Sequence, residues 1–217
     1  IDEYRRISEM DPTQARSVNN HYFDIGITLD KSQEYEKAMT LYKRVMETDP
    51  DQFASVNNQV RLFIIHRKDP RSALLLLNKL NERVYELSDE ERYHTFKNLG
   101  WALIEMDSTS DAEAWLRAAV KSLEGPGKEE LRQRCGAGAH FLLGKALEAQ
   151  QGRLDETLRE WDAFARLLQQ HDEQRVVRSA LLGVRAPQDP AHVGGDPARA
   201  DDGARRGGHG ALPSPRS

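Results

Sequence analysis

The stretch "NNHYFDIGITLDKSQEYEKAMTLYKRVMETDPDQ" (residues 19–52) contains two segments in which apolar residues recur every three or four positions. This spacing places the apolar side chains on one face of an α-helix. Only a few polar residues separate the two segments, and a connection this short makes consecutive helices antiparallel neighbours. Gly26 and Ala38 are small, as is expected where two helices cross closely. The stretch therefore predicts an antiparallel pair of helices.

The same periodicity continues along most of the chain, without the alternation that is typical of strands. Ser88 with Glu91, and Ser110 with Glu113, have the spacing of a capping box at a helix start. Pro70 suits the first turn of a helix. The predicted helix pairs are 14–31 with 34–48, 51–67 with 70–86, 89–107 with 110–123, and 128–151 with 154–171. A further segment, 172–183, is expected to extend or cap the last helix.

The first pair also carries the residue identities of a known repeat, namely Tyr22, Ile25, Gly26 and Leu29 on its first helix, and Tyr35, Ala38, Tyr42, Val45 and Pro50 on and after its second. This pattern resembles the tetratricopeptide repeat (TPR), a helix pair of about 34 residues. Leu99-Gly100 and Leu143-Gly144 repeat its Leu-Gly element, whereas the second pair lacks it and the fourth needs a one-residue insertion. The resemblance implies an all-α, right-handed α-solenoid of TPR-like helical hairpins.

The segment "RVMETDP" (residues 44–50) closely repeats "RISEMDP" (residues 6–12). Residues 1–12 therefore look like a truncated half-repeat, which would expose an apolar face and offer a surface for self-association. We expect the chain to be a fragment of a longer protein. The expected repeat domain spans 1–183, with the half-repeat at 1–12, units near 14–50, 51–86, 89–123 and 128–171, and a capping helix at 172–183.

The remaining residues, 184–217, are rich in Gly, Pro, Ala, Arg and Asp and contain almost nothing large and apolar. Such a segment buries too little surface to offset its conformational entropy, so we expect a disordered tail.

Composition excludes several classes of protein. The net charge of the 217 residues is -4 and mixed in sign, which does not favour nucleic acid or an anionic membrane surface as a partner. No apolar stretch is long enough to cross a bilayer. The single cysteine, Cys135, rules out a disulfide framework and is compatible with a reducing compartment, so we expect a cytoplasmic protein.

The sequence offers little that resembles a catalytic or metal site. "GAGAHFLLGKA" (136–146) lacks the spacing and the Ser/Thr of a phosphate-binding loop. The histidines are scattered, although His66, His94 and His140 could face a groove, and no metal-ligand spacing is present. Cys135 is placed near a helix start, where we expect an inert thiol. We therefore predict no enzyme activity, no cofactor and no metal.

The TPR resemblance implies a binding groove on the concave face that the first helices form. Carried over position by position, this face would include Phe23, Ile27, Asn58, Leu62, Lys97, Trp101, Phe141 and Lys145. Two lysines, each one turn from an aromatic residue, could hold an extended acidic and apolar segment. Alternatively, Ile27 and Leu62 only pack between repeats and the lysines only aid solubility. The carboxylate clamp of some TPR co-chaperones is not expected, because Phe23 and Ile27 occupy its first two positions and Trp101 replaces its arginine.

Two functions remain open from the sequence. The first is a scaffold or adaptor that binds a partner peptide or helix in the groove, and here we expect Phe23, Asn58, Lys97, Trp101, Phe141 and Lys145 to make the contacts. The second is a regulatory or substrate-recruiting TPR segment of a larger enzyme whose catalytic domain lies outside this chain.

Overall fold

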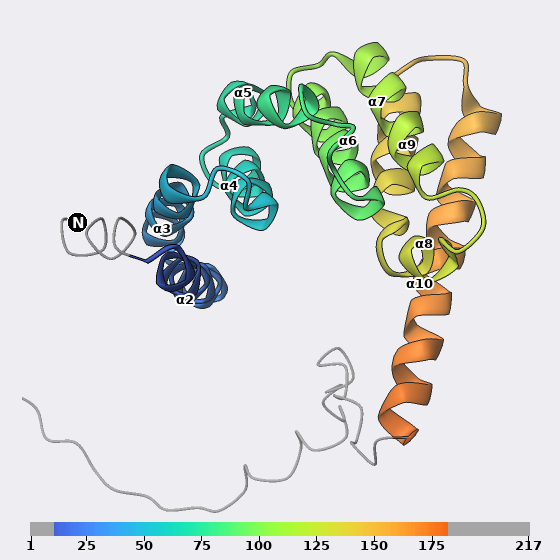
Figure 1. Cartoon of the computed structure of the whole chain (residues 1–217). Coiled ribbons are helices and arrows are strands. Elements are labelled where there is room, and N and C mark those ends of the chain that lie inside the picture. Colours follow the sequence, from blue (N-terminus) through green and yellow to red (C-terminus); the bar gives the residue numbers. More distant parts are fainter. Residues whose placement is uncertain (1–10, 182–217) are drawn as a thin grey trace, which may run out of the picture. The chain divides into compact units, whose positions relative to one another are not determined.

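The computed structural model describes residues 11–181 (Figure 1). Every regular element in this range is a helix, which confirms the prediction of an all-α chain. The helices are α2 (Pro12–Lys31), α3 (Tyr35–Thr48), α4 (Phe53–Ile65), α5 (Pro70–Asn81), α6 (Asp89–Ile104), α7 (Thr109–Ser122), α8 (Glu129–Cys135), α9 (Ala137–Glu148) and α10 (Leu154–Leu181). The expected disordered tail at 184–217 and most of the half-repeat at 1–12 lie outside the described residues.

Residues up to 174 belong to one compact unit, and the last residues of α10 belong to a second. Within the first unit, helices pack mainly on their neighbours in the chain: α2 on α3, α4 on α5 and α6 on α7. Successive pairs meet through α3 with α4 and through α5 with α6. In addition, α4 contacts α6 and α6 contacts α9, so that the first helices of successive pairs also lie against one another.

Close helix crossings occur where the sequence has glycine. A Cβ atom on Gly26 would lie 2.7 Å from Cε1 of Tyr42, and one on Gly100 would lie 2.4 Å from Cγ of Leu116. On Gly144 it would lie 3.0 Å from Cε2 of Trp161. Because these glycines have no side chain, the two helices of a pair cross closely, and one large side chain of the second helix packs directly on the glycine, as the sequence pattern predicts.

The apolar core is a chain of small clusters between consecutive helices. One cluster joins α3 to α2 and α4, the next joins α4, α5 and α6, and two more join α6, α7 and α9. Alanines such as Ala38, Ala73 and Ala112 are completely buried within it, beside larger residues such as Leu116. Each pair thus buries its apolar face against the next pair.

Several helix boundaries differ from the predicted ones. α2 begins at Pro12 rather than at residue 14, because the Asp11 carboxylate caps the helix by accepting the backbone N–H of Thr13 at 2.9 Å. α4 and α5 are shorter than predicted, and α5 ends at Asn81 instead of residue 86. The turn that follows is held by Arg83, which binds both Asp51 and Glu86.

The predicted helix 128–151 is broken into α8 and α9 at Gly136. A Cβ atom there would lie 2.6 Å from the carbonyl oxygen of Arg132, so glycine permits a close backbone approach at the break. As expected, the segment from residue 172 onward extends the predicted helix 154–171, and together they form one continuous helix, α10, that is described as far as Leu181. Cys135 accordingly lies at the end of α8 and directly before Gly136, the N-cap of α9, so it is near a helix start as predicted.

The capping box predicted at Ser88 is present. The Ser88 hydroxyl accepts the backbone N–H of Glu91 at 3.3 Å, and the Glu91 carboxylate accepts the N–H of Ser88 at 2.9 Å. The second predicted box is wrong, because α7 is N-capped by Ser108, whose side chain makes no capping bond, and Ser110 lies inside the helix.

Replacing Ser88 with alanine is therefore expected to lower the free energy of unfolding by about 1 kcal/mol, because one N-terminal N–H of α6 loses its acceptor. Ser108→Ala is the matched control, since this N-cap side chain accepts no bond. Urea denaturation followed by circular dichroism measures both. Equal losses in the two variants would contradict the assigned cap.

Candidate functional site

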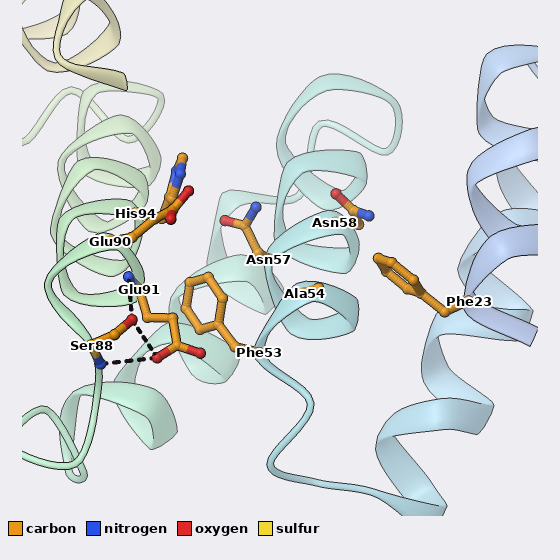
Figure 2. A pocket seen from close by; sticks show the side chains of 9 residues that line it. All are labelled: Phe23, Phe53, Ala54, Asn57, Asn58, Ser88, Glu90, Glu91 and His94. Carbon is orange, nitrogen blue, oxygen red and sulfur yellow. Dashed lines mark hydrogen bonds between the residues drawn. The ribbon is translucent and has the colours of Figure 1, made fainter. Parts of the chain in front are cut away.

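A hollow of about 370 Å³ lies between α2, α4 and α6 (Figure 2). Its lining residues come from these three helices and from the N-cap of α6, and they are Phe23, Phe53, Ala54, Asn57, Asn58, Ser88, Glu90, Glu91 and His94. All three helices are first helices of consecutive pairs. The hollow is thus a surface that three successive pairs build together.

Two carboxamides occupy the α4 side of the hollow. In Figure 2, Asn58 projects from α4 on the side of Phe23, and Asn57 on the side of α6. The Asn57 side-chain oxygen accepts a hydrogen bond from Nδ2 of Asn98 at 2.6 Å, which fixes the orientation of this amide. A carboxamide offers both a donor and an acceptor, the same pair of groups that a peptide backbone needs.

Aromatic rings flank the carboxamides. The ring of Phe53 lies 6.5 Å, centroid to centroid, from the imidazole of His94. The ring of Phe23 lies 5.9 Å from that of Tyr42, which is fully buried. Because both phenylalanines are only partly buried, their rings offer apolar surface to the hollow.

The α6 side of the hollow carries two carboxylates. Glu91 is held in the capping box with Ser88, and Oε2 of Glu90 accepts a hydrogen bond from Nη2 of Arg134 at 2.9 Å. Among the described residues that line the hollow there is no lysine or arginine. The formal charge of the lining is therefore negative.

His94 is a neutral imidazole in this setting. Burial, and to a smaller extent the nearby Lys97, lower the pKa of His94 to about 4. Its Nδ1 atom is buried and has no hydrogen-bond partner among the described residues. The ring is therefore available as a neutral donor or ligand on the side of α6.

The structure brings together only part of the predicted groove. Phe23 and Asn58 line the hollow, whereas Lys97, Trp101, Phe141 and Lys145 do not. Leu62, expected on the same face, is buried in the core beside α3.

Lys97 is turned toward α8 and α9. Its Nζ lies 5.9 Å from the ring centroid of Tyr93, and its Cδ would lie 3.4 Å from a Cβ on Gly138. Burial lowers the pKa of this lysine, and the electrostatic interaction with Cys135 opposes that change. The ring of Trp101, one turn further on, packs against two core clusters, and its Nε1 donates to Oε1 of Glu105 at 3.2 Å.

Phe141 and Lys145 form a separate site on α9. Phe141 is 38% exposed and meets Trp161 of α10 edge-on, with 5.5 Å between the ring centroids. Nζ of Lys145 lies 5.8 Å from the centroid of the Phe141 ring. The two residues therefore lie close together as expected and form a cation–π pair, but neither of them lines the hollow.

The hollow also contains residues that the sequence did not single out, above all Phe53, Asn57 and Glu90. The sequence feature that could have identified the α4 residues is their spacing: Phe53 and Asn57, and likewise Ala54 and Asn58, lie one helical turn apart on one face of α4. His94 was considered as a groove residue on sequence grounds, and it does line the hollow.

A second hollow of about 390 Å³ lies near the C-terminal ends of α2 and α4. Its charged groups already pair within the chain: Arg61 binds Asp30, and Nε2 of His66 lies 3.2 Å from Oε1 of Glu36. Unlike the hollow between α2, α4 and α6, it is lined mainly by residues at the C-terminal ends of its helices, and its aromatic lining residue is Tyr35 rather than a phenylalanine.

Comparison with protein-family models finds no match for this chain, and a search of curated proteins finds no significant match either. The TPR resemblance consequently rests on the residues themselves. Within residues 11–181, none of the helices combines the length and apolar character needed to cross a membrane.

Proposed function

We propose that the chain is a protein-binding module that receives an extended segment of a partner protein in the hollow between α2, α4 and α6. In this proposal the helix pairs are a TPR-like, right-handed α-solenoid that acts as a scaffold or adaptor and performs no chemistry of its own. The repeated Gly contacts of Gly26, Gly100 and Gly144 support the TPR-like assignment, since each receives a large side chain from the second helix of its own pair.

The main support for the proposal is that the residues lining the hollow come from three different helix pairs. Phe23, Asn58 and His94 come from the first helices of three successive pairs, so the hollow continues from one pair to the next. An extended segment matches such a surface better than a compact ligand does. Carboxamides can pair with its backbone, and the phenylalanine rings can receive its apolar side chains.

The charge of the lining indicates the chemistry of the partner. Glu90 and Glu91 contribute two carboxylates, and Lys97 lies outside the hollow. We therefore propose an apolar segment with a basic residue, in place of the acidic and apolar segment expected from the sequence. Electrostatic complementarity of this kind increases both the specificity for the correct partner and the rate at which it binds.

The test is selection of peptides from a random library on the immobilised chain, followed by fluorescence anisotropy with the tightest binders. We expect apolar sequences with a basic residue, and about tenfold or greater loss of affinity in Asn58→Ala and Phe53→Ala. Tyr85→Ala is the control, because Tyr85 is 94% exposed and does not line the hollow.

Circular dichroism must show that each variant is folded. Selected peptides that bind the wild-type chain and both hollow variants equally well would place the binding surface elsewhere. Enrichment of acidic peptides would contradict the proposed charge of the partner.

A further inference from the structure

Three side chains of types that bind metal ions converge at the α6 side of the hollow. Glu90, His94 and Cys135 each offer one ligand atom, and these atoms all lie within 4.8 Å of one another. Glu90 and His94 are four residues apart on α6 and therefore share one face of that helix, as Figure 2 shows. Cys135 reaches them from the last position of α8.

Contacts between α6 and the end of α8 hold this arrangement. The hydroxyl of the fully buried Tyr93 donates a hydrogen bond to the backbone carbonyl of Cys135. Nη2 of Arg134 donates to Oε2 of Glu90 at 2.9 Å, and this leaves Oε1 on the side of the thiol, 4.0 Å from Sγ of Cys135. Arg134 thus orients the Glu90 carboxylate through Oε2, while Oε1 faces the cluster. In metal sites, an outer hydrogen-bond partner orients a ligand in the same way.

The ligand atoms are available. The buried Nδ1 of His94 has no hydrogen-bond partner within the described part of the chain. Cys135 is a free cysteine and is only partly buried. Ligand atoms around a tetrahedral zinc ion lie roughly 3–4 Å apart, given metal–ligand distances of about 2.0–2.3 Å. Small side-chain rotations therefore suffice to close the cluster around an ion.

The charges near the cluster are compatible with a divalent ion. A thiolate and a carboxylate together neutralise the two positive charges of the metal. The metal-bound site therefore has no net positive charge that would repel Lys97 and Arg134. Without metal, burial raises the pKa of the Cys135 thiol, and the positive charges of Arg134 and Lys97 oppose that change. Sulfur, imidazole and carboxylate ligands together favour a borderline-soft ion such as Zn²⁺ over Mg²⁺ or Ca²⁺.

We propose that Glu90, His94 and Cys135 bind Zn²⁺, with water in a fourth position. Binding converts the Cys135 thiol to a thiolate and releases its proton to solvent. The site joins α6 to the end of α8 across the border between two helix pairs. Glu90 and His94 also line the hollow, so a bound ion would neutralise the Glu90 carboxylate there, but zinc uptake itself requires no partner segment.

The test is titration of the metal-free chain with Zn²⁺ against a chromophoric zinc indicator. We expect the wild-type chain to take up one equivalent, with affinity at least about tenfold weaker in Cys135→Ser and in His94→Asn. His21→Asn is the matched control, because His21 is an exposed histidine on α2, and it should bind as the wild type does. Circular dichroism confirms that each variant is folded.

A second measurement uses the only cysteine of the chain, so that any thiol reaction reports on Cys135 alone. Zn²⁺ should slow alkylation of Cys135 in the wild type and in His21→Asn, but not in His94→Asn. Replacement of Zn²⁺ by Co²⁺ should produce a thiolate charge-transfer band that Cys135→Ser abolishes. Failure to take up Zn²⁺, or uptake that all variants share, would overturn the proposal and leave at most adventitious surface binding.

Discussion

Leu116→Ala is expected to lower the free energy of unfolding by about 2–5 kcal/mol. Leu116 is completely buried, and it lies in a cluster that also contains Leu143 and Leu147 of α9. Truncation removes apolar contacts between α7 and both of its neighbours and leaves a cavity. Urea denaturation followed by far-UV circular dichroism measures the loss.

A second substitution makes this test specific for the helix crossing. Gly100→Ala alone places a Cβ 2.4 Å from Cγ of Leu116. The cost of overpacking, about 1–3 kcal/mol, exceeds or cancels the gain of about 1 kcal/mol from better helix propensity. In the Leu116→Ala background the same methyl group enters the cavity, so Gly100→Ala should become stabilising there.

Gly138→Ala is the control for this cycle, because its Cβ would meet its nearest neighbours at an ordinary 3.4 Å. It should be neutral or stabilising by about 0.5–1 kcal/mol in both backgrounds. If Gly100→Ala changed stability equally with and without Leu116, the two residues would not share the crossing between α6 and α7.

The glycine contacts explain why the fold was predictable. Gly26 meets Tyr42 and Gly100 meets Leu116 at the same separation in sequence, whereas Gly144 meets Trp161 with one residue more. That extra residue is the insertion predicted for the fourth pair. Local periodicity sufficed here because each pair is formed from residues that are close in sequence and repeats the same packing.

The candidate site was less predictable, because it depends on contacts between pairs. Lys97 was assigned to the groove by its helical position, but its side chain packs over Tyr93 toward α8 and α9. Likewise, the approach of Cys135 to Glu90 depends on the end of α8 at Gly136, and no local spacing encodes this. The sequence therefore predicted no metal site where the structure gathers three ligand-type side chains.

Glu113 is another residue whose contacts between helix pairs could not be predicted from local sequence spacing. Its spacing from Ser110 suggested a capping box, but its carboxylate binds Arg117 on its own helix and two residues of the next pair, Gln150 and Arg153. It accepts hydrogen bonds from Nε of Arg117 at 2.8 Å, Nη2 of Arg153 at 3.0 Å and Nε2 of Gln150 at 3.1 Å. Burial raises the pKa of the Glu113 carboxyl, but hydrogen bonds from Arg153 and Arg117 outweigh burial and lower the pKa to about 2.

We expect Glu113→Gln to lower the free energy of unfolding at neutral pH by roughly 1–3 kcal/mol, because it removes the less exposed of the two carboxylates, Glu113 and Glu156, that Arg117 and Arg153 share. The side chain of Glu113 is only 15% exposed, which places this ion pair between the surface and buried cases. The measurement is urea denaturation of both chains over a range of pH.

The pH dependence gives the more discriminating result. Since folding lowers the pKa of Glu113 from its usual value of 4.5 to about 2, the carboxylate contributes its full stability above about pH 4.5. That contribution disappears as the pH falls through about 2, where the protonated acid and the glutamine become equivalent. The difference in stability between wild type and Glu113→Gln should therefore shrink from pH 4.5 downward.

Glu36→Gln is the matched control, since Glu36 also pairs with an arginine of the next helix pair, Arg67, but with both side chains largely in solvent. Salt and water screen such an exposed pair, so this variant should match the wild type within measurement error. A loss in Glu36→Gln as large as that in Glu113→Gln would show that charge alone, and not the partly buried network around Glu113, stabilises the border between consecutive helix pairs.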